Sequence, residues 1–553
     1  MRQWMVAAKK ADFYAIAEKF HVDPVVARII RNREVIGEKN IRIYLGGNLS
    51  DLSDPHQMKD MDRLVEILAQ KIRKQVHIRI IGDYDVDGVT SSHLFLTALR
   101  RVGAKVDVVI PHRIQDGYGL SLHLLQQAKE DGVDTILTCD NGIAAIDEIA
   151  WAKAQKMTVL VTDHHAVPFE EHEGRRTEKK SLADAVVNPH QQDCGYPYKE
   201  LCGAGVAWNV IRVLYENYDM DKREAEDLLD FVAMATVCDV MSLTGENRIL
   251  VKEGLKRIRH TKNIGLQALM QACNVQPENI SAYHFGYVLG PCVNATGRLD
   301  TARHALRLFE TGQETEAEEI ARDLVDLNQE RKELTLQGVE MAKKLCEEGG
   351  YEKDPVLVLF LPDVHESIAG LIAGRIREMY NRPVFVLTRG EEGVKGSGRS
   401  TENYSMYENM CGCAELFTKF GGHPMAAGLS LPEENVEKFR RKINENCPLT
   451  VEEVCPDIHI DMAMPVGYAS TELVHQFALL EPFGKDNPSP LFADRNLSIS
   501  RMWVIGKNRN VLRMSVLSEY GQPVPVIFFG DVETLFAYFT EKFGQEEVEN
   551  ALH

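Results

Sequence analysis

Short apolar runs alternate with amphipathic stretches through the first third of the chain. Four runs are rich in β-branched residues, which favours strands. Between them lie stretches whose apolar positions recur at helical spacing. Strands alternating with helices of these lengths predict βαβ units and a parallel sheet, hence an α/β fold class. The predicted strands are 77–83, 105–111, 135–140 and 158–163, and the helices are 91–103, 121–132 and 144–155.

Helical patterns dominate on both sides of this region. Residues 11–20, 26–35 and 52–74 have apolar positions at helical spacing. Residues 166–200 are charged and contain proline and glycine, which indicates a connection. Residues 316–348 contain no proline and one glycine, so they predict a single helix about 45 Å long that joins two domains.

The rest of the chain predicts two further domains. Residues 355–363, 367–380 and 382–389 read as strand, helix and strand, a second α/β unit. After residue 456, short strands are separated by turn signals, which is typical of a small β-barrel. These strands are expected at 458–462, 496–506, 511–518 and 524–530.

Composition excludes several classes of protein. A length of 553 residues suggests three to four domains. No run approaches the ~18 apolar residues of a membrane span, and the start has no apolar signal segment. Eleven cysteines without a C-x-x-C pair predict free thiols. With 63 basic and 82 acidic residues the net charge is −19, so nucleic-acid binding would need a locally basic groove.

The acidic loop after the first predicted strand is the sharpest feature of the sequence. Asp83, Asp85 and Asp87 stand at alternate positions between Gly82 and Gly88, a crowding of carboxylates that favours a bound cation. A calcium-binding EF-hand would need a glutamate at the twelfth position, where Leu94 stands, and a helix before the loop. A metal-dependent phosphoryl site at the end of a parallel strand fits better, with a solvated turn as the plain alternative.

Two more polar motifs follow predicted strands. Asp140-Asn141-Gly142 and Asp163-His164-His165 each lie where the carboxyl ends of parallel strands form a ligand crevice. Asp239 stands in an apolar stretch, which leaves a structural role and a metal role equally open. Together these motifs could hold two divalent ions that activate water, and mixed carboxylate and imidazole ligands favour Mn²⁺ over Mg²⁺. The expected ligands are Asp85, Asp87, Asp140, His164 and Asp239, with Asp83, Asp163 and His165 close by.

This constellation resembles the DHH phosphoesterase superfamily. Further motifs in the same order narrow the resemblance to its single-strand-specific exonucleases, from about residue 45 to the end. They are CDVMSL (238–243), PCVNATGRL (291–299), LNQERK (327–332), VHESIAGLIAGRI (364–376), GSGRS (396–400), GGHPMAAGLS (421–430) and EPFGKDNPSPLF (481–492).

The resemblance implies a DHH domain with a parallel sheet, a long connecting helix, a DHHA1-type α/β domain and a C-terminal OB-like β-barrel. The implied activity is metal-dependent 5′→3′ hydrolysis of single-stranded DNA to 5′-mononucleotides in repair and recombination, with two divalent ions, Mn²⁺ or Mg²⁺. The implied limits are 1–50 for an N-terminal helical segment, 51–310 for the DHH domain, 311–350 for the helix, 351–450 for DHHA1 and 456–553 for the barrel. The implied metal ligands are Asp83, Asp85, Asp87, Asp140, His164 and Asp239, and the catalytic residues Asp140, Asp163, His164 and His165.

Substrate contacts are expected in three places. Ser397 and Arg399, in a Gly-flanked loop, could hold a phosphate together with Gly421, Gly422 and His423. Asn294 and Arg298 are expected on the same path, although Arg298 could equally be tied to carbonyl groups. The departures from the family pattern are Thr296 in place of alanine and Asp486 after Lys485, a carboxylate that puts the DNA contacts of that loop in doubt. In the barrel, Phe483, Lys485, Trp503 and Lys507 are expected to contact DNA, with Phe492, Arg501 and Arg509 as further candidates.

The resemblance also implies partners and a location: a single-stranded-DNA-binding protein, a RecQ-type helicase, and a monomer in the bacterial cytoplasm. Two other readings remain. A DHH phosphodiesterase for short oligonucleotides or cyclic dinucleotides would not need the C-terminal barrel. A binding scaffold with an inactive site would have lost ligands, and none is missing here.

Overall fold

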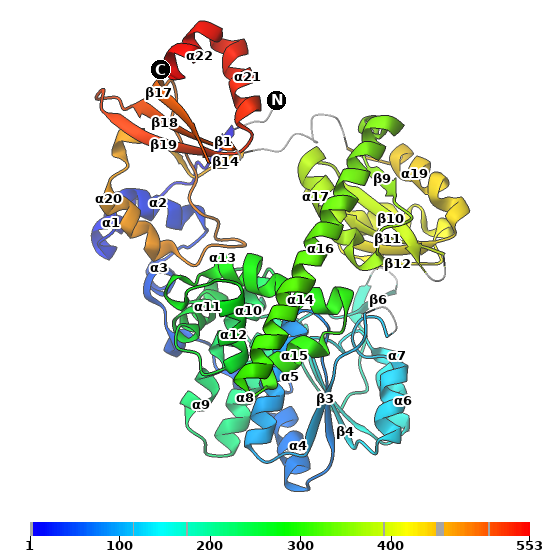
Figure 1. Cartoon of the computed structure of the whole chain (residues 1–553). Coiled ribbons are helices and arrows are strands. Elements are labelled where there is room, and N and C mark those ends of the chain that lie inside the picture. The colour runs from blue at the N-terminus through cyan, green and yellow to red at the C-terminus, as the bar shows by residue number, and fades with distance from the viewer. Residues whose placement is uncertain are drawn as a thin grey trace. The chain divides into compact units, whose positions relative to one another are not determined.

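A parallel sheet is built from the β-branched runs of the first third of the chain (Figure 1). The computed structural model describes residues 4–113, 116–172, 175–390, 393–449, 458–506 and 509–552. The strand order is β3-β2-β4-β5-β8, and every neighbouring pair is parallel. The strands are β2 (Ile78–Ile81), β3 (Val106–Val109), β4 (Thr135–Cys139), β5 (Thr158–Thr162) and β8 (Ala185–Val187).

Helices cover both faces of this sheet because its strands alternate buried side chains on each side. Ile80 and Leu137 face a core formed with α4, α5 and α8. Ile136 and Val159 face the opposite core, formed with α6 and α7. These helices are α4 (Met61–Arg73), α5 (Val86–Arg101), α6 (Leu122–Glu130), α7 (Ile146–Ala154) and α8 (Gly203–Asn217).

A helical layer follows and leads into the long helix α16 (Glu314–Gly349). One stripe of α16 serves two cores: Ile320 and Leu324 pack in the first domain, and Val339 and Ala342 pack against the second sheet. The preceding elements are α9 (Lys222–Glu226), α10 (Leu229–Cys238), α11 (Gly245–Ile258), α12 (Ile264–Ala272), α13 (Ala282–His284), the π-helical turn η4 (Phe285–Leu289), α14 (Gly290–Leu299) and α15 (Arg303–Glu310).

The second sheet has five strands in the order β12-β13-β11-β10-β9. Only β9 and β10 are parallel; the other pairs are antiparallel. The elements are β9 (Leu357–Phe360), α17 (Ala369–Tyr380), β10 (Val384–Gly390), β11 (Gly393–Arg399), α18 (Met406–Cys411), β12 (Lys419–Gly422), β13 (Ala426–Leu431) and α19 (Val436–Glu445).

The two ends of the chain form a compact unit of their own. It contains Met1–Leu45, Asp457–Glu481 and Pro488–His553, whereas Gly46–Pro456 and Pro482–Asn487 form the other unit. Strand β1 (Trp4–Val6) pairs in parallel with β14 (Ile458–Ile460), and an antiparallel sheet is ordered β17-β18-β19. The remaining elements are α1 (Phe13–Phe20), α2 (Pro24–Asn32), α3 (Glu38–Gly46), β15 (Met462–Ala463), α20 (Thr471–Phe477), β16 (Phe492–Ala493), β17 (Ser498–Ile505), β18 (Val511–Leu517), β19 (Pro523–Phe529), α21 (Val532–Phe543) and α22 (Gln545–Leu552).

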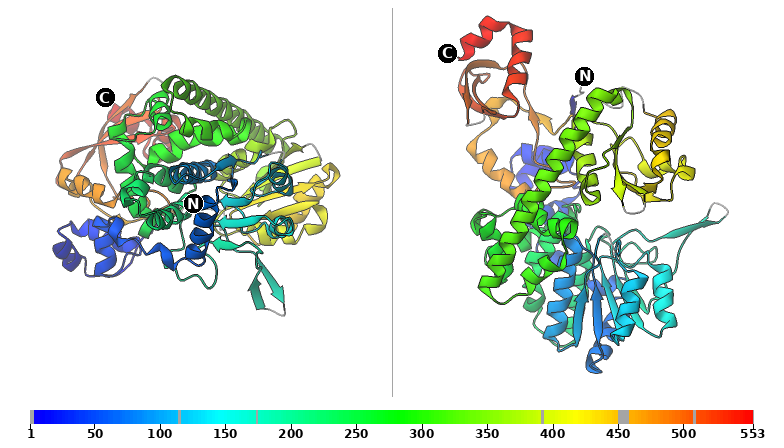
Figure 2. Two further views of the ribbon diagram at one scale, coloured as in Figure 1. Left: turned by 90° about the horizontal axis from the view of Figure 1, so that it is seen from below. Right: turned by 45° about the vertical axis from the view of Figure 1, so that its right-hand side comes forward.

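Three local expectations need correction. The predicted connection 166–200 contains strand β8 and a hairpin, β6 (Phe169–His172) with β7 (Arg175–Glu178), which stands away from the sheet (Figure 2). The glycine-flanked segment around Ser397 is not a loop but strand β11, paired on both sides with β10 and β13. The N-terminal segment contains the expected helices, α1 to α3, but it begins with the strand β1.

Two predictions based on composition hold within the described part of the chain. Every cysteine there is free, as expected. Among the same residues, no helix combines the length and the apolar character that crossing a bilayer requires.

Candidate metal centre

The acidic and imidazole motifs meet at the carboxyl ends of three neighbouring strands. Asp83, Asp85 and Asp87 follow β2, Asp140 follows β4, and His164 follows β5. Because β2, β4 and β5 are adjacent and parallel, these side chains lie at one edge of the sheet. Asp239 joins them from another element, as the C-terminal capping residue of α10. Asp239 therefore lies in the same cluster of possible ligands as Asp87 and His164.

Three overlapping groups of side chains could each hold a cation. Within each group the possible ligand atoms lie within 4.8 Å of one another. His164 Nε2 lies 3.1 Å from Asp140 Oδ1 and 3.6 Å from both Asp87 Oδ2 and Asp239 Oδ2. Asp140 and His164 each belong to two groups, so they lie where the groups meet. The groups are Asp140–His164–His165, Asp87–His164–Asp239 and Asp83–Asp85–Asp140.

Several ligand atoms are buried without a hydrogen-bond partner. Both carboxylate oxygens of Asp83, Oδ1 of Asp140 and Nε2 of His164 form no hydrogen bond within the described residues. Leaving a buried charged group unsatisfied costs more than a lost hydrogen bond. Carboxylate oxygens and a neutral imidazole nitrogen are ligands that divalent ions such as Mn²⁺ accept. The donor set therefore fits a divalent metal site.

Backbone geometry brings the ligands this close. Asp140 has a positive φ of 60°, a conformation that asparagine and aspartate tolerate better than most residues. Gly203 must be glycine, because a Cβ there would lie 2.6 Å from Asp140 Cβ. Gly88 is equally constrained, since its Cβ would lie 2.5 Å from the Asp83 backbone nitrogen. The first turns of α5 and α8 are thus packed directly against the acidic loops.

Helix α8 orients Asp87. The amide groups of Gly203 and Ala204 donate to its two carboxylate oxygens at 2.6 and 2.8 Å. These are free amides of the first turn of the helix, where the helix dipole also favours a negative charge. One face of the carboxylate is therefore fixed by the backbone, and Oδ2 still reaches to 3.6 Å from His164 Nε2.

Asp163 belongs to none of the three groups and instead forms a hydrogen bond with the neighbouring ring of His165. It accepts hydrogen bonds from the amides of Ile143 and His164 and from His165 Nδ1 at 2.8 Å. Burial alone would lower the pKa of His165, but the bond to Asp163 and nearby carboxylates outweigh it and raise that pKa to about 9. Asp163 therefore favours the protonated form of His165 and is its positioning residue.

The carboxylates of the cluster repel one another. Burial first, and then the charges of neighbouring aspartates, raise the pKa of Asp83, Asp140 and Asp239 well above the usual value of 3.8. The same causes raise the pKa of Asp85. Without a cation, the folded protein thus holds several negative charges at a cost in stability.

We expect Asp83→Asn to raise the melting temperature of the metal-free protein at pH 7.5. The variant removes one repelled charge, and each kcal/mol corresponds to about 2–4 °C in a domain of this size. A raised pKa in the folded state means that the charge destabilises the fold above that pKa, so the gain should vanish as the pH falls towards 3.8. Mn²⁺ should stabilise the wild type more than the variant.

The measurement is thermal unfolding in EDTA and in Mn²⁺ across this pH range. Asp147→Asn, at an exposed position of the first turn of α7, is the matched control and should change neither temperature appreciably. Equal melting temperatures for Asp83→Asn and wild type in EDTA at pH 7.5 would contradict the electrostatic account.

Asn294 and Arg298 project from α14 towards this site. Asn294 Oδ1 accepts from the Val86 amide at 3.2 Å, so it supports the acidic loop. Arg298 Nη1 donates to the Ser367 carbonyl at 2.8 Å. Burial and the charges of Arg113, Arg331 and Arg399 lower the pKa of Arg298 to about 9. Arg298 forms no ion pair with a carboxylate in the part of the chain that the structure describes.

Arg113 is a cationic residue that the sequence did not single out. Its guanidinium lies 4.7 Å from the centre of the Tyr84 ring, within the acidic loop. Burial lowers the pKa of Arg399, and the positive charge of Arg113 lowers it further. No sequence pattern marks Arg113, because it lies on a turn between β3 and α6.

Ser397, Arg399, Gly421 and Gly422 lie on one sheet. Ser397 and Gly421 are both paired with Gly428 of the strand between them, so they flank the same position. Arg399 Nη1 donates to its own neighbour, the Gly398 carbonyl, at 2.8 Å. His423 follows β12 and is exposed. These expected phosphate contacts therefore occupy neighbouring rows of the second sheet.

The expected DNA contacts near the C-terminus fall into two units. Phe483 and Lys485 belong to the segment Pro482–Asn487, which forms one compact unit with Gly46–Pro456. The Lys485 carbonyl there accepts a hydrogen bond from the Leu243 amide. Trp503 lies in the other unit and is 42% exposed, in one row with Arg513 and Ile527. Phe492 stacks on Phe477, and Arg501 and Arg509 are exposed. Lys507 lies outside the described residues.

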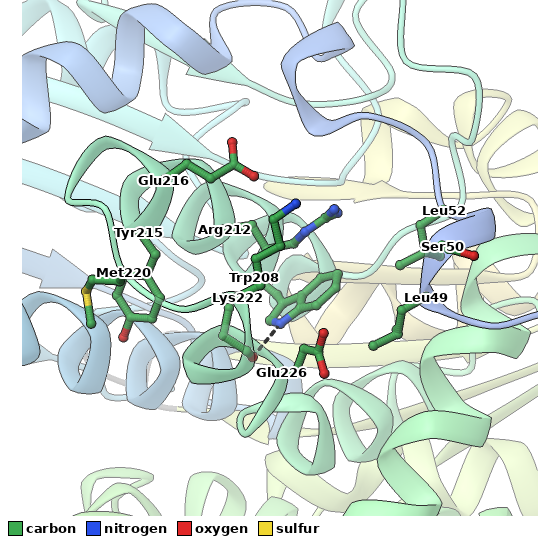
Figure 3. Close-up of a pocket in the computed structure, with 11 residues that line it drawn as sticks. Leu49, Ser50, Leu52, Trp208, Arg212, Tyr215, Glu216, Met220, Lys222 and Glu226 are labelled. Atoms are coloured by element: carbon green, nitrogen blue, oxygen red, sulfur yellow. Dashed lines mark hydrogen bonds between the residues drawn. The ribbon is translucent and has the colours of Figure 1, made fainter.

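A separate cavity of about 350 Å³ lies between α8, α9 and the turn after α3 (Figure 3). The indole Nε1 of Trp208 donates to the Ala225 carbonyl at 2.7 Å. Two carboxylates line the cavity, and both already have a partner: Glu216 contacts His56 and Glu226 contacts Arg257. None of the three candidate metal groups includes a residue of this cavity. The possible metal ligands therefore all lie away from it, at the edge of the parallel sheet.

Models of three known domains match this chain in order. They are the DHH family N-terminal domain at residues 77–236, the DHHA1 domain at 353–447 and the RecJ OB domain at 460–545. These matches and the two sheets confirm the predicted fold class.

Curated relatives cover most of the chain. The single-stranded-DNA-specific exonuclease RecJ of Haemophilus influenzae is 34% identical over 518 residues, which span 90% of this chain and 88% of the relative. RecJ of Bacillus subtilis is 33% identical over 512 residues, or 92% of this chain, but the match spans only 63% of that longer relative.

Solved structures agree. The crystal structure of RecJ from Thermus thermophilus in complex with Mn²⁺ superposes with a TM-score of 0.78 and 26% identity, covering 96% of this chain and 79% of that one. A crystal structure of exonuclease RecJ bound to manganese gives a TM-score of 0.60 at 31% identity, covering 70% of this chain and 94% of that one. The chain therefore belongs to the RecJ family of single-stranded-DNA-specific exonucleases.

Proposed function

We propose that this chain hydrolyses single-stranded DNA from its 5′ end to 5′-mononucleotides, in DNA repair and recombination, with two divalent ions. The observation that carries the proposal is the set of three overlapping ligand groups, two of which contain Asp140 and two His164, with buried oxygens that form no hydrogen bonds among the described residues. Three overlapping groups offer more ligand positions than one ion needs. The mixture of carboxylates and imidazoles favours Mn²⁺ as the preferred ion.

The residues of the chain have distinct roles in this proposal. Asp83, Asp85, Asp87, Asp140, His164 and Asp239 hold the ions, which when bound would lower the pKa of a water molecule and polarise a phosphodiester. Asp87 is pre-oriented by the amides of Gly203 and Ala204. Asp163 accepts a hydrogen bond from His165 and favours its protonated form, in which His165 would donate a hydrogen bond to a phosphate oxygen.

A cluster of arginines supports a substrate that carries phosphates. The charges of Arg113 and Arg399 act on the buried Arg298, and none of the three forms a carboxylate ion pair among the described residues. Guanidinium groups without counter-ions favour a bound anion, and their planar donors match phosphate oxygens. We assign Ser397, Gly421, Gly422 and His423 to the same phosphate-binding surface, because Ser397 and Gly421 flank one position of the second sheet.

The C-terminal domain favours a long substrate over a small one. A phosphodiesterase for short oligonucleotides or cyclic dinucleotides has no use for a second binding domain. This chain matches the RecJ OB domain at 460–545, and the exposed row of Trp503, Arg513 and Ile527 offers an aromatic ring and a cation on one sheet face. Such a face suits stacked bases and phosphates of a single strand. Phe483, Lys485 and Lys507 stay proposed contacts as well.

Digestion of end-labelled single-stranded DNA tests the proposal. A block at the 5′ terminus should stop release of mononucleotides, whereas a block at the 3′ terminus should not, and a blunt duplex should resist in both forms. Mn²⁺ should support a higher rate than Mg²⁺ at equal concentration. Degradation that starts from the 3′ end would contradict the polarity, and hydrolysis of cyclic dinucleotides alone would favour the small-substrate alternative.

The remaining proposals concern organisation and context. We retain 51–310 as the DHH domain, 311–350 as the connecting helix, 351–450 as the DHHA1 domain and 456–553 as the OB-like domain, with 1–50 as an N-terminal segment. A single-stranded-DNA-binding protein and a RecQ-type helicase are proposed partners, and a monomer in the bacterial cytoplasm is the proposed state.

A further inference from the structure

A groove lies between the connecting helix α16 and helix α17 of the second domain. Its volume is about 590 Å³. Helix α16 contributes Lys332, Leu336 and Lys343, and α17 contributes Leu371, Arg375 and Met379. The α17 residues recur every four positions, and the α16 residues at intervals of four and seven, or one and two helical turns, so the groove runs along the two helices. From Arg331 to Lys343 it extends for roughly 18 Å, or about three helical turns.

The groove is positively charged, although the whole chain carries −19. Four cations line it, Arg331, Lys332, Lys343 and Arg375, against two carboxylates, Glu340 and Glu378.

Each carboxylate already has a cationic neighbour. Lys343 lies 2.7 Å from Glu340, and Arg375 lies 3.4 Å from Glu378. Arg331 donates only to the neutral Asn328, and neither Arg331 nor Lys332 forms an ion pair within the described ranges. Two positive charges are thus left without counter-ions.

Aliphatic side chains are exposed along the same groove. Leu336 is 63% exposed and Met379 is 53% exposed, which is high for large apolar residues. Leu371 and Val339 extend the apolar floor. Methionine adapts its shape to a partner, and a contiguous exposed apolar patch with a polar rim is typical of docking surfaces.

The residues that line the groove distinguish between two possible occupants, a DNA strand and a protein helix. The Arg331 end adjoins the arginine cluster, because the charge of Arg331 acts on Arg298. A DNA strand is therefore the obvious competitor. However, none of the described residues that line the groove is aromatic, whereas surfaces that bind single strands usually stack bases on aromatic rings. Aliphatic contacts flanked by cations suit an amphipathic helix with an acidic outer face.

We propose that the α16–α17 groove is a docking site for an acidic amphipathic helix of another protein, about three turns long. The apolar side of that helix would cover Leu336 and Met379, and its carboxylates would pair with Lys332 and Arg331. The complementarity of charge supports this occupant over a basic or neutral peptide.

A labelled peptide tests the docking site on the full-length chain. The probe is a fluorescein-labelled helix of twelve to fourteen residues with leucines on one face and glutamates elsewhere. A scrambled peptide of the same composition, without an apolar face, is the second probe. We expect the amphipathic peptide to bind, the scrambled peptide to bind at least tenfold more weakly, and binding to weaken with salt.

Variants locate the binding. Leu336→Ser and Lys332→Glu should each weaken binding of the amphipathic peptide at least tenfold. Met341→Ser and Lys344→Glu, exposed positions of the same helix outside the groove, should leave it unchanged. Hydrolysis of a short oligonucleotide should be unaffected in all four variants.

Three results would overturn the proposal. They are equal binding of both peptides, equal affinity in groove and control variants, or loss of oligo(dT) affinity in Leu336→Ser and Lys332→Glu together with displacement of the peptide by oligo(dT). The last result would assign the groove to the path of the DNA strand.

Discussion

Replacing Asp140 with alanine is expected to abolish the release of nucleotides from single-stranded DNA. Asp140 is shared by two of the three ligand groups, and its Oδ1 lies 3.1 Å from His164 Nε2. Its loss should therefore reduce turnover by at least about 10³-fold, as when a group that organises charge at a reacting centre is removed. DNA binding should survive, because the arginine cluster and the second sheet remain intact.

The backbone of Asp140 suggests a second variant for the same position. Since its φ is 60°, alanine adds local strain of about 1–2 kcal/mol to the loss of the carboxylate. Asp140→Asn keeps a residue that tolerates this conformation and removes only the charge. Both variants should be inactive, and the asparagine variant should unfold at the higher temperature.

Single-turnover digestion and fluorescence anisotropy in excess Mn²⁺ measure the two effects separately. Asp147→Ala, at an exposed position on α7, is the matched control and should behave as the wild type. If Asp140→Ala retained more than about a tenth of the wild-type rate, a difference of less than 1.4 kcal/mol, Asp140 could not be at the reacting centre.

Replacing Arg33 with methionine is expected to detach the N-terminal segment from its unit. Arg33 donates to both oxygens of Asp461, at 2.7 and 2.9 Å, and the two side chains are only 9% and 7% exposed. Breaking a buried pair by removing one partner leaves an uncompensated charge and costs about 3–5 kcal/mol. The same guanidinium also donates to the Pro488 carbonyl, so one residue joins three distant segments.

Denaturant unfolding and hydrogen exchange of the full-length chain measure this loss. Protection of β1 and β14 should fall, and affinity for long single strands should weaken more than turnover of short ones. Arg31→Met is the control, because Arg31 pairs with the exposed Glu34 and should cost at most ~0.5 kcal/mol. Arg33→Lys should lie between the two. A stability loss no greater than that of Arg31→Met would show that the segment is held by other contacts.

The sequence predicted the assembly of the cluster because its motifs follow strands of one parallel sheet. Asp87, Asp140 and His164 come from separate motifs, yet strand ends at one edge must converge. Asp239 could not be assigned, since its place depends on where α10 ends in space. Asp163 could not be distinguished from a ligand, because its role is set by the direction of the Ile143 amide and the His165 ring.

Other features depend on contacts that no local pattern contains. The segment around Ser397 is rich in glycine, which weakens strand propensity, but pairing with β10 and β13 makes it a strand. Arg113 joins Arg298 and Arg399 only through the tertiary fold. The pairing of β1 with β14 joins residues from opposite ends of the chain, where sequence periodicity gives no signal.

That pairing also sets an order of events during synthesis on the ribosome. Val6 must wait for Ile460, its partner in β14. At ~5–20 residues per second this interval is roughly 20–90 s. Until then Arg33, just after α2, also lacks Asp461, the carboxylate that it binds in the folded chain. The nascent N-terminal segment therefore reaches its final contacts only after the residues around Ile460 have been made.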